Sequence, residues 1–461
     1  MSNFSFSSLG VYGFERQAPA ILAALVTGDP LLLIGKSGTG KTFLLNSISE
    51  ALGLEHRHYN ASLVSFDDLV GFPYPDEERT EIRFLETPAT IWGAESVLVD
   101  EISRCKPEHQ NRLFSLVHER RIQGIALKDL RYRWAAMNPC SADQDSGEDY
   151  LGSEPLDPAL ADRFGIIVEV GDWDALSDED RRSVADPAGE GAPADDDGEL
   201  KGQLAAWRAV FERELAACPD GILDYVTAAV TALQDGGVRL SPRRARLLAR
   251  SLLAARIVRG RTTQKLFYSI LSCSIPHRAW GESPEQEKLR AAHRLAWDAA
   301  MLEGTDKWVH QFHLERRLDQ KAQLLLESCP NRDAGTLAIE QFIAQAPKER
   351  VGAFALATFP AAVAGKLPVG AEAVSDLGRV AGDLLTVDGE IKWQERLSEQ
   401  DTTHPELPAV AKLLGQLDGA RRERARQLLY WCLVNQCVPR RPAVFEAEFN
   451  ACVSVVAEHA A

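Results

Sequence analysis

The sequence LLLIGKSGTGKT at residues 31–42 decides the fold of the N-terminal part of the chain. Residues 31–34 are four consecutive apolar residues, which predict a short buried strand. Residues 35–42 then match the phosphate-binding loop pattern G-x-x-x-x-G-K-[ST]. Apolar residues at helical spacing follow over residues 43–48, so the loop opens a helix. This strand–loop–helix context predicts an α/β domain that binds a nucleoside triphosphate.

The loop residues have distinct predicted roles in holding phosphate. The glycines let the backbone turn successive N–H groups toward phosphate oxygens, and the helix N-terminus adds partial positive charge. Lys41 is predicted to reach the β- and γ-phosphates, and the Thr42 hydroxyl to ligate Mg²⁺. The alternative is an ordinary glycine-rich turn, which both flanks disfavour. The predicted nucleotide-binding residues of the loop are Gly35, Lys36, Ser37, Gly38, Thr39, Gly40, Lys41 and Thr42.

A second informative stretch is VLVDE at residues 97–101. Three apolar residues predict a buried parallel strand, and two carboxylates follow at its C-terminal end, where open α/β sheets bind ligands. Asp100 is predicted to hold Mg²⁺ through water. Glu101 is predicted to orient and polarise the water that attacks the γ-phosphate. Such a pair is a weak signal alone and a strong one about sixty residues after a phosphate loop.

Asn138 follows a third apolar strand, Ala135–Met137, and precedes a proline. A polar amide at a strand end beside the acidic strand is placed to hold the attacking water or to sense the γ-phosphate. The alternative is that the Asn-Pro pair only forms a turn.

Arg163 ends a short predicted helix, residues 156–164, just before an apolar strand at 165–170. An arginine there is placed to act as a finger that stabilises the charge developing on the transferred phosphoryl group. The alternative is a surface ion pair with Asp162 or Glu169.

The composition is that of an ordinary globular protein of 461 residues, long enough for two or three domains. No apolar run of about 18 residues occurs, so no membrane span is expected. The start MSNFSFSSLG lacks the features of a secretory signal. The eight scattered cysteines are interpreted as reduced thiols in a cytoplasmic protein. The net charge of −16 disfavours non-specific nucleic-acid binding.

Taken together, the motifs GKSGTGKT, VLVDEISR, AAMNP and LDPALADRF resemble the AAA+ ATPases, and more closely their MoxR-like branch. Further matching segments are DLVG at 68–71, NRLFSLVHERRI at 111–122 and LSPRRARLL at 240–248. The resemblance covers roughly residues 10–280, with the motifs in the family's order and at plausible spacing.

The resemblance implies particular roles and an assembly. Residues 35–42 correspond to Walker A, Asp100 and Glu101 to Walker B, and Asn138 to sensor 1. Arg163 corresponds to the arginine finger and Arg243 to the sensor 2 arginine, whereas Arg104 matches a basic position without an assigned role. The family forms hexameric rings with ATP and Mg²⁺ between subunits, so Arg163 would act on a neighbour's ATP. The resemblance leaves open whether Arg243 acts on the ATP of its own subunit or, as the displaced lid of this branch allows, on that of a neighbour. The family often works with partners that carry a von Willebrand factor A domain.

The expected domains are an AAA+ core at 1–170, an acidic flexible linker at 171–202, an all-α lid at 203–282 and an all-α C-terminal domain at 283–461. The C-terminal domain resembles no family that we recognise. Its periodicity predicts helices, and we expect this domain to bind partners or to serve in assembly. Its basic-aromatic piece at 310–317 is interpreted as a helix face rather than a metal or nucleic-acid site.

The function expected from these motifs is ATP hydrolysis by a ring that remodels a protein partner. One alternative is a nucleic-acid motor or loader, which the negative total charge disfavours. Another is a small-molecule kinase, which the order of Glu101, Asn138 and Arg163 disfavours.

Overall fold

The computed structural model describes residues 4–75, 82–105, 110, 113–122, 124–140, 150, 152–187, 198–386 and 406–460. The chain divides into two compact units, Met1–Ala300 and Met301–Ala461, and each is described by itself.

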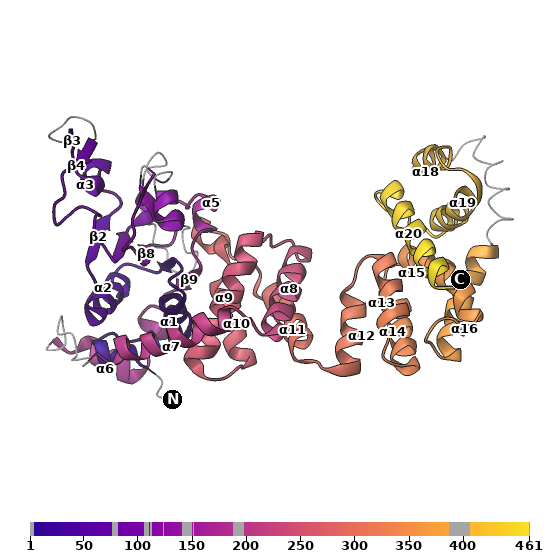
Figure 1. Ribbon diagram of the computed structural model, residues 1–461, viewed down its shortest axis with the longest axis horizontal. Coiled ribbons are helices and arrows are strands. Elements are labelled where there is room, and N and C mark those ends of the chain that lie inside the picture. The colour runs from indigo at the N-terminus through magenta and orange to yellow at the C-terminus, as the bar shows by residue number, and fades with distance from the viewer. Residues whose placement is uncertain are drawn as a thin grey trace. The chain divides into compact units, whose positions relative to one another are not determined.

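Five parallel strands form the central sheet of the first unit, in the order β2-β5-β8-β1-β9 (Figure 1). Their bounds are β1 Leu31–Ile34, β2 His56–Asn60, β5 Ser96–Asp100, β8 Tyr132–Met137 and β9 Ile166–Glu169. Every residue of β1 and β8 is buried, as expected for strands covered on both faces. Because parallel strands end at the same edge, the segments after β1, β5 and β8 meet there. The predicted α/β core is confirmed.

Two helices hold the phosphate loop against this sheet. Helix α1 (Ala18–Thr27) is apolar on all sides and buried from Ala18 to Val26, which makes it a core helix. Helix α2 (Lys41–Leu52) begins at the loop, and it contacts β5 and β8 as well as the later helix α7. The strand, loop and helix predicted for residues 31–48 are therefore present.

The segment that follows β2 lies on the surface and contains a small hairpin. Helix α3 (Phe66–Val70) starts with a capping box between Ser65 and Asp68. Strands β3 (Pro73–Pro75) and β4 (Ile82–Phe84) then pair antiparallel. The prolines of residues 72–75 predict irregular structure, yet β3 forms there, because an isolated two-stranded ribbon tolerates proline on its edges.

The segment after β5 departs from the sequence expectation. A 3₁₀ helix covers Ile102–Arg104, and the described end of the predicted helix at 107–120 contains a π-helix, Ser115–Glu119. Strands β6 (Arg121–Ile122) and β7 (Ile125–Ala126) form a tight hairpin around Gly124. Residues 132–134 do not join this hairpin as predicted, because they belong to β8 in the central sheet. Gln123 lies outside the described residues.

The segment expected to be a linker, 171–202, is helical in much of its described part. After α5 (Pro158–Ala161) and β9, a 3₁₀ helix forms at Trp173–Ala175 and α6 spans Asp178–Ala185, where Ser177 caps the first turn. Helix α7 (Glu199–Leu215) begins inside the same range. Residues 188–197 lie outside the described part of the chain.

Helices α7 to α11 complete the first unit. The remaining bounds are α8 Asp220–Asp235, α9 Pro242–Arg259, α10 Gln264–Cys273 and α11 Gln286–Met301. Helix α11 falls beyond the expected boundary at residue 283, yet it packs on the lid helices. The Tyr225 hydroxyl lies 2.7 Å from His293 Nδ1, and the rings of Phe267 and Trp297 meet edge to face at 5.6 Å. The two compact units therefore divide after Ala300.

Arg244 connects α9 to the core from a fully buried position. Its side chain is 1% exposed. Its guanidinium donates to the carbonyl oxygens of Phe164, Gly165 and Ser274. Burial lowers the pKa of Arg244 to about 10, so the group stays charged at neutral pH. Sequence reasoning placed this arginine in a basic cluster and did not distinguish it from its neighbours.

Replacing Arg244 with methionine is expected to destabilise the first unit by about 3 kcal/mol, because buried carbonyl groups lose their donors. The matched control is Arg246→Met, since Arg246 is exposed on the same helix. Thermal unfolding followed by circular dichroism should show a lower midpoint for Arg244→Met and an unchanged one for the control. Equal midpoints in both variants would contradict this role.

In the second unit, every described regular element is a helix, as predicted. The helices are α12 Gly304–Leu314, α13 Leu318–Ser328, α14 Arg332–Gln345, α15 Lys348–Val363, α16 Ala371–Thr386, α18 Leu407–Leu414, α19 Gly419–Val434 and α20 Pro442–Ala460. Phe312, Phe342 and Phe354 lie at the centre of one apolar core. The helix face predicted for residues 310–317 is interrupted, because α12 ends at Leu314 and α13 begins at Leu318. The basic-aromatic piece therefore spans a helix end and a turn. No described helix is long and apolar enough to cross a bilayer.

Candidate nucleotide site

The phosphate loop takes the backbone conformation that its glycines allow. Gly38 and Gly40 both have φ near +80°, a region that other residues avoid. Gly35 has no room for a side chain, since a Cβ there would lie 3.0 Å from Val170 Cβ and 3.1 Å from Thr39 Oγ1. The Thr39 hydroxyl donates to the Lys36 carbonyl at 2.9 Å and closes the loop. This arrangement matches a loop that wraps phosphate with backbone N–H groups.

Lys41 is buried under the loop with its ammonium group at the centre. Its Nζ donates to the carbonyl oxygens of Gly35 at 2.7 Å and Lys36 at 2.6 Å, and it lies 3.4 Å from Asn138 Oδ1. Burial lowers the pKa of Lys41 to about 8, although the charges of Asp100 and Glu101 oppose this shift. The ammonium is thus present at neutral pH and is held where phosphate oxygens would arrive.

ATP affinity is expected to fall as pH rises above about 8, because only the protonated Lys41 ammonium attracts phosphate. The loss should approach about tenfold per pH unit, with affinity constant below this range. Titrations with ATP between pH 7 and pH 10 measure it, and Lys41→Arg is the control because a guanidinium stays charged. A pH-independent affinity in the wild-type protein would contradict the assignment.

Thr42 and Asp100 come together as the sequence predicted. The Thr42 hydroxyl donates to Asp100 Oδ2 at 2.8 Å, which joins the start of α2 to the end of β5. Burial raises the pKa of Asp100. Hydrogen bonds from His58, Thr42 and the Glu101 N–H outweigh that effect and hold this pKa below its usual value. A hydroxyl beside an ionised carboxylate is the oxygen donor set that Mg²⁺ prefers next to triphosphate. These two residues therefore fit a Mg²⁺ site.

His58 is a member of this group that sequence reasoning missed. It projects from β2, and its Nε2 lies 3.4 Å from Asp100 Oδ2. Because β2 pairs with β5 in register, with Asn60 opposite Asp100, His58 stands two residues upstream on the neighbouring strand. Strand order is a tertiary property, so the local sequence around His58 carried no signal for this contact.

Glu101 has an unusual backbone conformation at the end of β5. Its φ of 51° is left-handed, which is uncommon for a residue with a side chain and is often found at functional sites. Its N–H donates to Asp100 Oδ1 at 2.9 Å, and its carboxylate lies 3.6 Å from Arg104 Nε. Arg104, which had no predicted role, thus holds the Glu101 carboxylate in this structure.

Asn138 ends β8 directly beside the loop, because Met137 pairs with Ile34 in the sheet. The residue is 9% exposed, and its Oδ1 faces the Lys41 ammonium. Its carbonyl accepts from Ser153 Oγ at 3.3 Å, and Ser153 also donates to Ser103 Oγ at 2.9 Å. The side-chain amide therefore faces the Lys41 ammonium, a position that the turn interpretation alone does not require.

A cavity of about 730 Å³ opens beside Gly38, Thr39 and Gly40. Tyr12 and Phe14 line it from the N-terminal segment, and Trp173 and Leu176 line it from the segment expected to be a linker. Such a mixed aromatic and apolar lining next to a phosphate loop suits a nucleotide base. The acidic composition of residues 171–187 indicated only a linker, so their contribution to the lining of this cavity was not predicted.

Arg163 and Arg243 lie together but apart from the phosphate loop. The Arg163 guanidinium stacks 4.6 Å from the Phe114 ring centre and donates to the Ala159 carbonyl. Arg243 Nη1 donates to Asp162 Oδ2 at 2.8 Å. Within the described part of the chain, neither arginine hydrogen bonds to the loop. The alternative ion pair of Arg163 with Asp162 or Glu169 is not formed, because these acids pair with Arg243 and Arg278.

The two arginines form a small positive surface, and His118 lies beside them. Burial lowers the pKa of Arg163, and the neighbouring charge of Arg243 lowers it further. Burial, followed by Arg243 and Arg163, lowers the pKa of His118. Arg163 Nε is buried and has no hydrogen-bond partner among the described residues. Arg163, whose charged form the neighbouring Arg243 disfavours and whose Nε has no partner among the described residues, is suited to receive an anion.

A parallel sheet with a phosphate loop after β1, paired acids after β5 and an amide after β8 defines a P-loop nucleoside triphosphatase. Comparison with known proteins narrows the class. Residues 30–164 match the family model of the AAA domain (dynein-related subfamily), so this part of the chain is an AAA domain. The match supports the resemblance of the chain to the AAA+ ATPases of MoxR-like type.

Two individual proteins are similar to parts of the chain. The structural protein ORF618 of Acidianus two-tailed virus is 28% identical over 162 residues, which are 34% of this chain and 25% of that protein. The chain thus spans about a quarter of that relative's length. A crystal structure of a candidate ATPase from Cytophaga hutchinsonii overlaps 62% of this chain and 91% of that one, at 18% identity and a TM-score of 0.44.

Proposed function

We propose that the chain is an ATP-hydrolysing AAA+ remodeller of MoxR type that works as a ring on a protein partner. The proposal rests on the observation that the predicted site residues lie in two separate groups. Lys41, Thr42, Asp100, Glu101 and Asn138 gather at one sheet edge, whereas Arg163 and Arg243 form a separate positive surface. A second copy that brings this surface to the loop would complete the site.

In this mechanism each group of the loop side has one task. The loop N–H groups and Lys41 bind the β- and γ-phosphates. Thr42 and Asp100 are the residues that would hold Mg²⁺, which would neutralise phosphate charge. Glu101 accepts hydrogen bonds from water and orients it toward the γ-phosphorus. Asn138, whose side-chain amide faces Lys41, keeps that amide beside the phosphate that leaves. These tasks describe hydrolysis, because water is the acceptor that Glu101 activates.

Arg163 is proposed to act across the interface between copies, and mixing variants tests this. Arg163→Ala and Glu101→Gln subunits are each expected to be inactive alone, since an arginine finger contributes roughly 10³–10⁵ in rate. In equal mixtures, about one quarter of interfaces pair an intact Glu101 with an intact Arg163, and ATPase activity should recover to that extent.

The control replaces Arg163→Ala by the double variant Arg163→Ala/Glu101→Gln, whose mixtures with Glu101→Gln contain no complete interface. Phosphate release is measured across mixing ratios after light scattering confirms mixed assemblies. Mixtures as inactive as the control would contradict a shared site.

The partner is proposed to be a protein, following the resemblance to a family that often acts with von Willebrand factor A domains. The helical second unit offers surface for docking, and the hexameric chaperone-like ring is part of the same proposal. A nucleic-acid motor is the alternative, and the net charge of −16 counts against it. Stimulation of ATP turnover by DNA or RNA would favour that alternative.

A further inference from the structure

Arg163 is held by an aromatic ring rather than by a carboxylate. Its guanidinium carbon lies 4.6 Å from the centre of the Phe114 ring, and its Nη1 donates to the Ala159 carbonyl. Among the residues that the structure describes, Arg163 forms no ion pair, although Asp162 and Glu119 are close enough to oppose the lowering of its pKa. The positive charge of Arg163 is therefore held in place without a directly paired anion.

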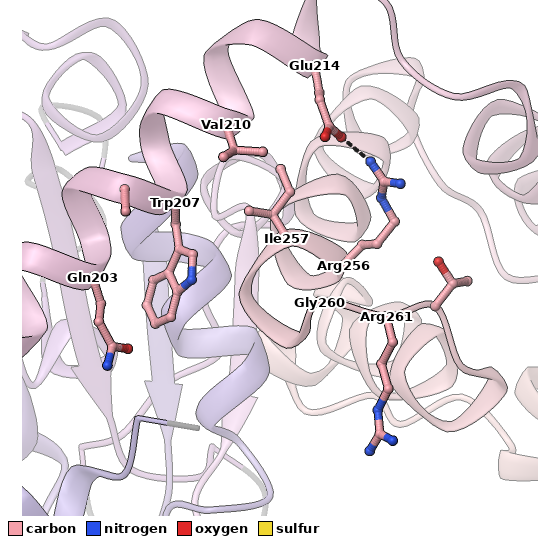
Figure 2. Close-up of a pocket in the computed structure, with 10 residues that line it drawn as sticks. Gln203, Trp207, Val210, Glu214, Arg256, Ile257, Gly260 and Arg261 are labelled. Atoms are coloured by element: carbon pink, nitrogen blue, oxygen red, sulfur yellow. Dashed lines mark hydrogen bonds and ion pairs between the residues drawn. The ribbon is translucent and has the colours of Figure 1, made fainter. Parts of the chain in front are cut away.

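Several other arginines of the first unit are paired with carboxylates. Figure 2 shows one of them, Arg256 near the end of α9, in contact with Glu214 of α7 beside a pocket of about 470 Å³. Arg250 of the same helix pairs with Asp29 in a similar way. A carboxylate fixes an arginine but also neutralises it, whereas a ring attracts the cation and leaves its charge in place. A ring is thus the support suited to an arginine whose charge acts on another molecule.

Phe114 occupies a position that the core of the first unit fixes. It directly precedes the π-helix Ser115–Glu119, a rare element that is frequent at functional sites. Leu116 and Val117 of this helix are buried in the apolar core, and Phe114 packs partly buried against the same core. The ring that contacts Arg163 is therefore held by packing and can serve as a rigid support.

The stretch that carries Phe114 also contacts the start of α5, the helix that precedes Arg163. Gln110 is 5% exposed, and its Oε1 accepts from the Asp157 N–H at 3.2 Å. Its Nε2 donates to the Cys105 carbonyl at 3.2 Å. Asp157 is the residue that caps the first turn of α5. Side chains from one stretch thus hold α5 at its first turn and Arg163 just after its last one.

We propose that Phe114 is the positioning residue of Arg163, and that its ring holds the guanidinium in the orientation in which it meets the γ-phosphate bound by a second copy. The inference rests on the proposed function, in which Arg163 acts across the interface. An arginine side chain is long and loses much rotamer freedom when it is fixed. A ring that fixes it in advance removes this cost from the reaction. Phe114 takes no part in the chemistry and acts only through Arg163.

The first test removes the ring and keeps an apolar side chain. Phe114→Leu is expected to lower kcat for phosphate release about tenfold, the effect of one cation–π contact. KM for ATP should stay within about twofold, because the phosphate loop is unchanged. Phe114→Tyr keeps the face of the ring and should restore kcat to within about twofold of the wild-type value. The matched control is Phe84→Leu, since Phe84 also packs partly buried against this core, and its kcat should be unchanged.

Mixed assemblies show on which side of the interface Phe114 acts. At the same total protein concentration, an equal mixture of Phe114→Leu with Glu101→Gln should be about threefold more active than Phe114→Leu alone. About one quarter of its interfaces then pair an intact loop side with an intact finger. An equal mixture with Arg163→Ala should fall to about half of the Phe114→Leu rate, because no intact finger is present. A defect on the loop side of the Phe114→Leu subunit would give the reverse pattern.

Circular dichroism checks the fold, and Phe114→Met, whose flexible side chain fills irregular space, replaces Phe114→Leu if that variant unfolds. A wild-type kcat in Phe114→Leu, with Arg163→Ala inactive, would overturn the proposal and leave the shared site intact. The reverse pattern in the mixtures would overturn it too, as would a kcat in Phe114→Tyr as low as that in Phe114→Leu. A wild-type kcat in Arg163→Ala would instead show that the proposed shared site is wrong, and the role of Phe114 with it.

Discussion

Replacing Lys41 with alanine is expected to abolish ATP binding at ordinary nucleotide concentrations. The ammonium is buried under the loop, 2.7 Å and 2.6 Å from two loop carbonyls, and is the main positive charge held there. In the complex with ATP this ammonium would donate to phosphate oxygens. Hydrogen bonds to a charged group contribute roughly 1.5–3 kcal/mol each, so losing two such bonds to phosphate weakens binding by about 100-fold or more. Isothermal titration calorimetry with ATP and Mg²⁺ measures this loss.

The matched control is Lys36→Ala. Lys36 belongs to the same loop, where its predicted contribution to phosphate binding is its backbone N–H, which alanine retains. Its ammonium lies 3.5 Å from Asp172 and its side chain is partly exposed. Lys36→Ala should bind ATP within a few-fold of the wild-type protein. Near-normal affinity in Lys41→Ala would remove the basis of the nucleotide site.

Glu101→Gln is expected to keep ATP binding and to stop turnover. The glutamine fills the same space, but it cannot take a proton from water, and a positioned general base contributes roughly 10²–10⁴ in rate. The substitution leaves the hydrogen bond from the residue 101 N–H to Asp100 unchanged, since that bond uses the backbone. Steady-state phosphate release and ATP affinity, measured on the same preparation, separate the two effects.

Glu95→Gln is the control for this change, because Glu95 precedes the same strand at its opposite end and its carboxylate accepts the Glu55 N–H. It should hydrolyse ATP at the wild-type rate. Turnover by Glu101→Gln at that rate would show that another group activates the water.

The parts of the site that the sequence predicted are those in which one short segment specifies both structure and chemistry. The phosphate loop carries its own glycines, lysine and hydroxyl, and β5 delivers Asp100 and Glu101 as one strand end. Their meeting, through the Thr42–Asp100 hydrogen bond, follows from parallel strands ending at one edge. For this reason the core and these residues required no tertiary information.

The parts that the sequence did not predict depend on which distant segments become neighbours. His58 reaches Asp100 only because β2 is next to β5. Trp173 and Leu176 line the base cavity although their segment is acidic and resembles a linker. Arg244 and Arg243 are consecutive, yet one is fully buried and the other pairs with Asp162 at the surface. Composition and periodicity do not separate such neighbours.

The most direct measurement of the central claim is phosphate release by the purified chain with ATP and Mg²⁺ and no other acceptor. Water is the only acceptor in that reaction, so turnover distinguishes an ATPase from a small-molecule kinase. The account predicts steady phosphate release that disappears in both Lys41→Ala and Glu101→Gln. Release no greater than that of Lys41→Ala, at protein concentrations that support assembly, would contradict it.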